Sequence, residues 1–304
     1  NGYVVIIEAG TFLDKKLYER ITSNNLQVFV QNESYNEYKQ YTQENKKNSN
    51  NKIEILDLSE EVKNSLNIDK ILSEEKLASE KLKTIYFIGN NLINSWLLIK
   101  NKKRIPLDAF ECLIENIVEI VNENDVRLSC INEFIDNNYS LSTHLLNVTL
   151  FTSLIANQLD LDFIDQKKLL LSAIFHDIGK TEIDEVLLEK PDILSDYEFG
   201  LIKEHSMQSV KLVKKAGLKD RIIVDGIRHH HERLDGSGYP DGLYAKRISD
   251  FGQILAVCDV FDALITTKPY RGAYNTFNAL TLIRKEYKNS LNMKYVNIFI
   301  KLLN

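Results

Sequence analysis

The sequence predicts a mainly α-helical protein in which a small α/β domain precedes a larger, all-helical domain. Short runs rich in β-branched residues lie near the N-terminus, at residues 3–7 and 26–30, whereas apolar residues at helical spacing dominate from about residue 126 onward. All six histidines lie in this second part. We therefore divide the chain into a domain at residues 1–125 and a domain at residues 126–304.

The composition excludes several classes of protein. Hydrophobic residues make up 44% of the 304 residues and charged residues 27%, which is typical of a globular protein. The formal net charge of −5 argues against a general DNA-binding or RNA-binding protein, because such proteins are usually basic. The three cysteines are widely separated, so they offer no disulfide framework or paired metal-binding motif and favour a reducing compartment.

No segment of the sequence indicates a membrane span or an export signal. No apolar run is long enough to cross a bilayer, and the N-terminus lacks the basic and apolar regions of a signal peptide. We therefore expect a cytoplasmic protein. The chain begins at Asn1 and not at a methionine, which leaves open whether it is a fragment of a longer protein.

The first domain is expected to contain strands and helices in alternation. The elements are a strand at 3–7, a helix at 14–22, a strand at 26–30, a helix at 34–47, a strand at 53–56, a helix at 59–83 and an extended segment at 84–88. Tyr35, Tyr38 and Tyr41 form a stripe that favours packing over ligand stacking. No phosphate loop or catalytic cluster occurs here, so a sensing, docking or regulatory role is the default.

Apolar residues at helical spacing predict a further helix at residues 108–123. Its apolar stripe consists of Phe110, Leu113, Ile114, Ile117, Val118 and Val121. Packing in a core, which is the commoner case, would explain this stripe. The alternative is a linker helix that transmits a signal or forms a homodimer.

The first chemical motif ends an almost continuous apolar segment at residues 169–175 and reads His176-Asp177-Ile178-Gly179-Lys180. Histidine and aspartate are rarely buried at such a place without hydrogen bonds or a cation. His144 and His205 lie in flanking helical patterns. Taken singly, each of these two is more often an ordinary core or surface histidine than a ligand.

A second motif is His229-His230-His231, followed by a loop that contains Gly238-Tyr239-Pro240. Imidazole is the commonest protein ligand of transition metals, although a solvated His-rich turn is the ordinary alternative. Further along, Asp259 and Asp262 lie one turn apart in a strongly apolar helix predicted at residues 248–266. A metal ion or a fixed hydrogen-bond partner would explain two acids in such a segment.

Together these motifs supply seven nitrogen and oxygen ligands, namely His144, His176, Asp177, His205, His230, His231 and Asp259. This set exceeds what one ion needs and suits two ions with Asp177 as a bridging carboxylate. Such ligands favour iron, manganese, zinc, nickel or cobalt over calcium. Two ions about 3.5–4 Å apart would activate a water and stabilise both oxygens of an in-line phosphoester displacement. Lys180, Lys268 and Arg271 could neutralise phosphate charge, although each alone is more often merely solvated.

The order of these motifs resembles the HD superfamily of metal-dependent phosphohydrolases. His205, His230-His231 and Gly238-Tyr239-Pro240 make the sequence similar to the HD-GYP subfamily in particular, and the segments at 259–264 and 268–271 match that subfamily's later motifs. The resemblance covers about residues 130–280. It implies an all-helical domain that hydrolyses cyclic di-GMP to linear pGpG, and often on to GMP.

The resemblance also implies a role for each residue. The metal ligands would be His144, His176, Asp177, His205, His230, His231 and Asp259. Lys180 and Arg271 would contact phosphate, and the loop with Tyr239 would shape the substrate site. From the residues themselves we add Lys268 as a further phosphate contact, and we expect Asp177 and Lys180 to act in catalysis. We expect two divalent transition-metal ions, iron or manganese first, with zinc, nickel or cobalt as alternatives.

Four positions depart from the family's pattern. Ser140 stands where some members have a glutamate that helps to hold a third metal, so we predict two metals. Lys268 replaces an arginine and loses its bidentate geometry. Ser249 replaces a proline, which we interpret as a structural change only, and His229 is an extra histidine that we interpret as a neighbour of the site and not a ligand.

Two alternative functions stay open at this point. An HD hydrolase could act on another cyclic dinucleotide or nucleotide, although the Gly-Tyr-Pro loop and the paired histidines favour cyclic di-GMP. A non-catalytic module could instead sense cyclic di-GMP without cleaving it. A degenerate module of that kind is expected to have lost ligands, and this chain retains the whole set.

Overall fold

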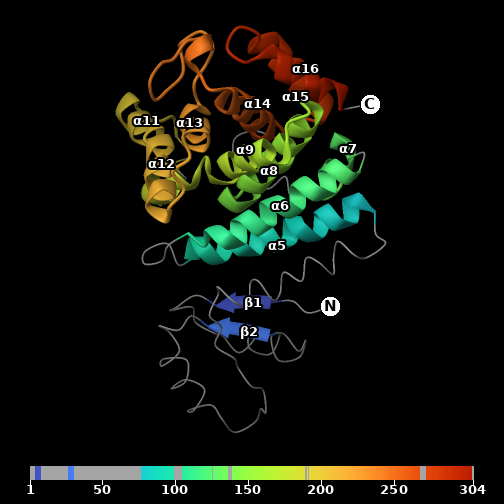
Figure 1. Ribbon diagram of the computed structural model, residues 1–304. Helices are drawn as coiled ribbons and strands as arrows, with labels where there is room; N and C mark the ends of the chain where they lie inside the picture. Colours follow the sequence, from blue (N-terminus) through green and yellow to red (C-terminus); the bar gives the residue numbers. More distant parts are fainter. Residues whose placement is uncertain are drawn as a thin grey trace, which may run out of the picture. The chain divides into compact units, whose positions relative to one another are not determined.

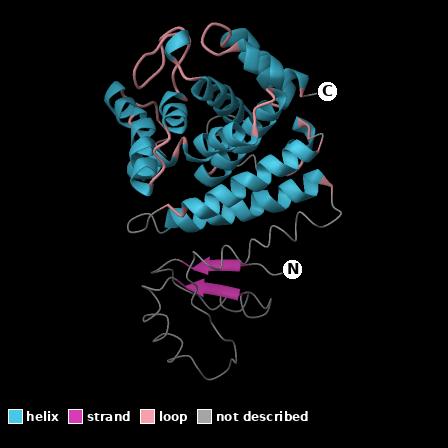
Figure 2. Ribbon diagram, in the orientation of Figure 1, coloured by secondary structure: helices cyan, strands magenta, loops and turns pink. Residues whose placement is uncertain are grey.

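The computed structural model describes residues 4–7, 27–30, 77–98, 105–124, 126–135, 139–188, 190, 192–267 and 272–302. The chain divides into two compact units, residues 1–67 and residues 68–304. The described part of the second unit is built from helices (Figure 1, Figure 2). The mainly helical fold that the sequence predicts is therefore confirmed.

The described residues of the first unit are two short strands, β1 (Val4–Ile7) and β2 (Gln27–Val30), which pair in parallel. They lie within the two β-branched runs that predict strands. The other elements predicted for residues 1–76 lie outside the described residues. The small α/β domain and its boundary after residue 125 therefore stay predictions.

The second unit contains a series of helices that surround one long buried helix. Its described elements are α5 (Ala78–Leu98), α6 (Leu107–Glu123), α7 (Leu128–Asn132), α8 (Leu141–Gln158), α9 (Phe163–Phe175), the 3-10 helix η2 (Ile178–Glu182), α10 (Glu185–Leu188), α11 (Asp196–Lys203), α12 (His205–Ala216), α13 (Arg221–His229), the 3-10 helix η3 (Ala245–Arg247), α14 (Asp250–Ile265), α15 (Thr276–Glu286) and α16 (Met293–Lys301).

One predicted element is wrong. The sequence predicts an extended segment at residues 84–88, but these residues lie inside α5. Their β-branched and aromatic side chains favour a strand locally. However, buried residues recur through this segment at helical spacing, namely Leu82, Ile85, Tyr86, Leu92, Ile93 and Trp96. Packing of this face against the rest of the unit overrides the local preference.

α6 lies where the sequence predicts a helix, and its apolar stripe is buried. The helix packs against α5, α8 and α9, and α5 and α6 lie side by side in Figure 1. Packing in the core, the commoner of the two interpretations, therefore accounts for the stripe.

α8 is the central helix of the unit. Its residues from Ser142 to Ala156 are all buried, and it contacts α5, α6, α9, α14 and α16. Phe151 packs edge to face against Phe261 of α14 and Phe299 of α16, with ring centroids 5.0 Å and 5.8 Å away. The helix begins at a capping box made by Ser140. Because α8 is enclosed on all sides, its polar side chains need partners inside the protein. Thr149 and Ser153 bond to carbonyl groups of α8 itself, whereas the partners of His144 and Asn147 include Asp262 of α14.

η2 approaches α12 so closely that a side chain does not fit between them. An added Cβ at Gly179 would lie 2.0 Å from the His205 carbonyl oxygen and 2.5 Å from the Ser209 backbone nitrogen. The Gly179 N–H also donates a hydrogen bond to Ser209 Oγ at 2.7 Å. Glycine is required here because two backbones meet, and this contact fixes the residues after Asp177 against α12.

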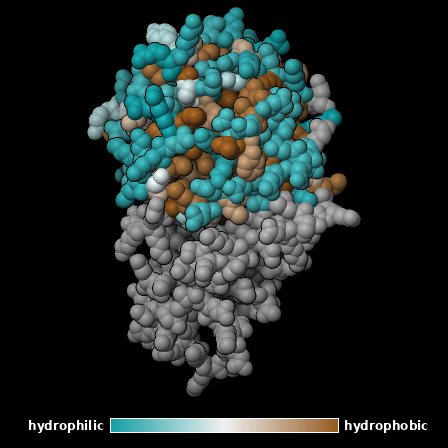
Figure 3. Space-filling model, in the orientation of Figure 1, coloured by the Kyte–Doolittle hydropathy of each residue, from teal (hydrophilic) through white to brown (hydrophobic). Residues whose placement is uncertain are grey.

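The outer surface of the helical unit is mixed in polarity. Figure 3 shows one face on which hydrophilic residues surround smaller hydrophobic areas. None of the helices in the described ranges combines the length and the apolar character that crossing a bilayer requires.

We predict that Gly179→Ala lowers the free energy of unfolding by about 1–3 kcal/mol, because the added methyl group meets backbone atoms that cannot move independently. Gly200→Ala is the matched control, since Gly200 is exposed in α11 and an added Cβ there meets no atom within 4 Å. This control should gain about 0.5–1 kcal/mol. Urea denaturation measures both. Equal stabilities of the two variants would contradict the role given to Gly179.

Candidate metal centre

The seven predicted ligands come together in two groups. One group consists of Asp177, His205, His230 and His231, and the other consists of His144, His176 and Asp259. In each group the candidate ligand atoms all lie within 4.8 Å of one another. They are supplied by α8, the end of α9, α12, the end of α13 and α14. Every side chain except that of His231, which is half-buried, is buried.

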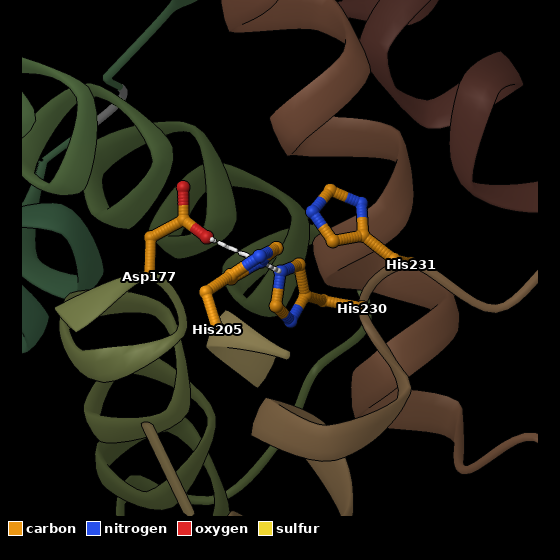
Figure 4. A group of neighbouring side chains, drawn as sticks. All are labelled: Asp177, His205, His230 and His231. Carbon is orange, nitrogen blue, oxygen red and sulfur yellow. Dashed lines mark hydrogen bonds and ion pairs between the residues drawn. The ribbon is translucent and has the colours of Figure 1, made fainter. Parts of the chain in front are cut away.

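The carboxylate of Asp177 lies between the two groups. Its Oδ2 is 3.2 Å from His144 Nε2, while its Oδ1 is 2.9 Å from His205 Nε2 and 3.4 Å from His230 Nε2. Figure 4 shows the rings of His205 and His230 pointing toward this carboxylate. Asp259 has a similar place, with Oδ1 3.4 Å from His144 Nε2 and Oδ2 3.6 Å from His231 Nδ1. Both carboxylates therefore face both groups.

Three of the histidines are oriented by the backbone. The Nδ1 atoms of His176, His205 and His230 each lie 2.6–2.7 Å from the carbonyl oxygen three residues earlier. A carbonyl oxygen only accepts, so Nδ1 carries a proton in each ring, and in the neutral ring Nε2 presents a lone pair. All three Nε2 atoms then face the centre in the form that binds metals.

This arrangement leaves a buried acceptor that lacks a donor. Asp177 Oδ1 is fully buried and has no hydrogen-bond partner, although His205 Nε2 is 2.9 Å away. In a neutral His205 ring with its proton on Nδ1, the carboxylate oxygen and Nε2 are two acceptors that face each other. Such a contact is unfavourable in a buried site, and a cation between the two atoms would remove the conflict. The residues therefore fit a metal ion.

The pKa values agree with ligands that are ready to bind a cation. Burial, only partly opposed by the charge of Asp177, lowers the pKa of His176 to about 3. Burial and the neighbouring histidines hold the pKa of His231 well below its usual value. Burial raises the pKa of Asp177, but Lys180 and the surrounding histidines outweigh it and hold that pKa well below its usual value. His176 and His231 are thus neutral and Asp177 is charged at neutral pH.

His144 is held differently from the three histidines described above. Its Nδ1 lies 2.7 Å from Asp262 Oδ2, and Asn147 Nδ2 donates to Asp262 Oδ1 at 2.8 Å. Burial lowers the pKa of His144, but the hydrogen bonds to Asp177 and Asp262 and their charges raise it to about 10. In the absence of a cation, a proton therefore occupies the nitrogen that faces the centre.

Sequence reasoning missed the roles of Asn147 and Asp262. It noted Asp262 one turn from Asp259 but gave it no partner, and it gave Asn147 no role. Helical spacing is the signal that could have found both, because each lies three residues after a predicted ligand on the same helix.

The chain belongs to the HD domain family. The sequence profile of the HD domain matches residues 113–294, more than half of the chain. The resemblance to this family that the motifs indicate is therefore confirmed. The match includes all seven candidate ligands.

Several curated proteins are similar to this HD domain protein. A cyclic di-GMP phosphodiesterase of Pseudomonas aeruginosa is 33% identical over 158 residues, which cover 52% of this chain and 38% of that protein. A 3'3'-cGAMP-specific phosphodiesterase of Vibrio cholerae is 37% identical over 132 residues, which cover 43% of this chain and 30% of that protein. A cyclic di-GMP phosphodiesterase of Thermotoga maritima is 28% identical over 237 residues, 73% of this chain and 61% of that protein. The chain thus spans less than two thirds of the length of these relatives.

One solved structure supports the fold. It is an HDG"Y"P protein from Bdellovibrio bacteriovorus, with a TM-score of 0.64, 18% identity, and coverage of 90% of this chain and 81% of that chain. At this level of identity the likeness shows a shared fold.

Lys180 and Tyr239 of the HD domain protein lie beside the two groups. Lys180 Nζ contacts Asp177 Oδ2, and its side chain is 20% exposed. Burial lowers the pKa of Lys180, but the charge of Asp177 raises it above the usual value, so the side chain keeps its proton. The ring of Tyr239 lies 4.7 Å from that of His231.

The loop that carries Tyr239 is held by a buried glutamate. Glu232 accepts hydrogen bonds from the backbone N–H groups of Asp241 at 2.7 Å and Leu243 at 2.8 Å. Its side chain is buried, so these charge-assisted bonds are shielded from water. They close the loop and fix Tyr239 beside the metal centre.

The sequence also singles out Lys268, Arg271, His229, Ser140 and Ser249. Lys268 and Arg271 lie outside the described residues. His229 is absent from both groups, and its Nδ1 lies 3.2 Å from the backbone nitrogen of Ser249. Ser140 and Ser249 are the N-caps of α8 and α14, so both have structural roles at helix ends.

We predict that Asp177→Asn lowers the affinity for divalent metal by more than about 100-fold, because it removes the charge that both groups share while keeping the size of the side chain. Metal content after dialysis, measured by atomic emission, and the rise in melting temperature on adding metal report this change. His229→Ala is the control and should bind metal as the wild type does. Equal metal content in Asp177→Asn and wild-type protein would contradict the assignment.

Proposed function

We propose that this HD domain protein is a metal-dependent phosphodiesterase that hydrolyses cyclic di-GMP to linear pGpG, with GMP as the alternative end product. The observation that carries the proposal is the place of Asp177, with one oxygen facing His144 and the other facing His205 and His230. Such a carboxylate suits two divalent ions, for which we favour iron or manganese over zinc, nickel or cobalt. Relatives named as phosphodiesterases of cyclic dinucleotides support the reaction class.

Each group of ligands would hold one ion, and Asp177 would be shared. When bound, the ions would supply an activated water and positive charge for the phosphate oxygens. The ligands would be His144, His176 and Asp259 for one ion and His205, His230 and His231 for the other. Because their orientations are fixed by hydrogen bonds, the ligands would need little rearrangement on binding.

Lys180 would position the phosphate next to the ions. It keeps its proton beside Asp177 and is partly exposed, so it would donate a hydrogen bond to a phosphate oxygen. Lys268 and Arg271 would add positive charge, the arginine through two hydrogen bonds. Tyr239, held beside His231, would form a wall of the substrate site.

A second substrate is supported by the relatives. A phosphodiesterase specific for 3'3'-cGAMP is 37% identical over 132 residues, and the cyclic di-GMP phosphodiesterase of Pseudomonas aeruginosa is 33% identical over 158 residues. The two identities are similar, so they favour neither substrate over the other, and both substrates contain the same kind of phosphodiester bond.

The division of the chain belongs to the same proposal. Residues 1–125 would form a small α/β sensing or regulatory domain, and residues 126–304 the catalytic domain. The parallel pairing of β1 and β2 supports the α/β character, because parallel strands need a long crossover connection. A homodimer through residues 108–123 would use the exposed side of α6, since its apolar stripe packs inside the unit.

We predict that the protein loaded with Mn²⁺ or Fe²⁺ converts cyclic di-GMP to pGpG, and that Asp177→Asn lowers kcat/KM by at least about 1000-fold because both ions lose a ligand. His229→Ala should keep wild-type turnover. Chromatography of the products, with cyclic di-GMP, 3'3'-cGAMP and cyclic di-AMP side by side, gives the substrate preference. Metal-loaded protein that binds cyclic di-GMP without cleaving any of the three would support a sensor and reject the enzyme.

A further inference from the structure

A chain of hydrogen bonds runs from α5 to His144 through buried side chains. The Tyr86 hydroxyl of α5 donates to Asn147 Oδ1 at 2.9 Å, and Asn147 Nδ2 donates to Asp262 Oδ1 at 2.8 Å. Asp262 Oδ2 lies 2.7 Å from His144 Nδ1. All four side chains are at most 4% exposed. Three helices, α5, α8 and α14, thus meet at one candidate metal ligand.

The two oxygens of Asp262 each have a defined partner. A carboxylate is unfavourable to bury unless it is paired, and here His144 and Asn147 each face one oxygen. Because a carboxylate oxygen accepts hydrogen bonds, His144 Nδ1 carries a proton toward Asp262, whether or not Nε2 carries one as well. His144 Nε2 is then oriented toward Asp177 and Asp259, from which it is 3.2 Å and 3.4 Å away.

His144 depends on other helices for its orientation, in contrast to His176, His205 and His230. Those three rings are fixed by a carbonyl oxygen three residues earlier in the chain. The partner of His144 is 118 residues away, on α14. A change in how the helices pack would therefore disturb His144 before the other three.

Asp262 and Tyr86 together fix which way the Asn147 amide points, because the carboxylate takes the NH₂ group and leaves Oδ1 for the Tyr86 hydroxyl. With the Tyr86 hydroxyl donating to Oδ1, the NH₂ group of Asn147 faces Asp262. The opposite orientation would place the amide oxygen against the carboxylate. The Tyr86 ring packs edge to face against Phe134, with ring centroids 5.7 Å apart. A shift of α5 would therefore move the Tyr86 hydroxyl relative to the Asn147 amide.

From this geometry we propose that Tyr86, Asn147 and Asp262 are positioning residues that set the metal affinity of the His144, His176 and Asp259 group. The inference rests on the metal centre of the proposed function and adds its regulation. α5 is the first described helix after residues 1–67. A movement of α5 along α8 would break the bond between Tyr86 and Asn147 and weaken metal binding without touching substrate.

The test measures metal affinity by competition with a chelator, in the absence of nucleotide. Asn147→Leu keeps the size of the side chain and removes both hydrogen bonds, so the affinity of one site should fall about 10- to 100-fold. Tyr86→Phe removes one hydroxyl and should lower that affinity about 2- to 10-fold. The other site should keep its affinity in both variants.

Two controls separate positioning from general loss of stability. Tyr295→Phe also removes a buried tyrosine hydroxyl, from α16, and should leave metal affinity unchanged. In the double variant, Tyr86→Phe should add no further loss to that of Asn147→Leu, because the effect passes through the same amide. With saturating metal, Tyr86→Phe should recover the wild-type kcat.

The outcomes distinguish the two proposals. Wild-type affinity in Asn147→Leu and Tyr86→Phe, with metal lost from Asp177→Asn, would overturn this inference and leave the metal centre standing. Equal losses in Tyr86→Phe and Tyr295→Phe would also overturn it. If Asn147→Leu does not fold, Tyr86→Phe and its control decide alone. A wild-type protein that binds metal but cleaves no cyclic dinucleotide rejects the proposed function and leaves this inference intact.

Discussion

The buried negative charge of Asp177 is the constraint on which the helical unit depends. Removing a carboxylate from water is unfavourable unless compensating groups surround it. Here Lys180 contacts one oxygen, and imidazole nitrogens from three other elements lie within 3.4 Å of the two oxygens. Oδ1 has no hydrogen-bond partner although His205 Nε2 lies 2.9 Å away, so a cation between the two atoms would complete the compensation. The same charge thus brings side chains from several helices together and makes their meeting point fit a cation.

The helix ends make this convergence compatible with backbone hydrogen bonding. The last carbonyl groups of a helix have no N–H partner within it. His176 and His230 follow directly after α9 and α13, and the Nδ1–H of each ring donates a hydrogen bond to one of these carbonyl oxygens. One hydrogen bond therefore satisfies the helix end and orients the ligand. α8 offers no such end near His144, which explains why that ring needs Asp262.

The sequence predicted the candidate ligands better than the residues that orient them. His176-Asp177 and His230-His231 are adjacent in sequence and follow apolar helices, so local patterns were enough to single them out. Helical spacing places Asn147 and Asp262 one turn from a candidate ligand, but their partners lie 115 and 118 residues away, and spacing alone does not name those partners. The extended segment predicted at residues 84–88 failed for a related reason, since burial against distant helices overrode the preference of its β-branched residues.

The contact at Gly179 limits how the metal centre can open. Backbone atoms of η2 and α12 touch there without side chains between them, so Asp177 and His205 belong to one rigid body. Their separation cannot widen unless this interface breaks. His231, which is half-buried, and the loop with Tyr239 take no part in this backbone contact. The hydrogen bonds to Glu232 hold that loop in place, so the surroundings of His231 depend on a residue outside the set of candidate ligands.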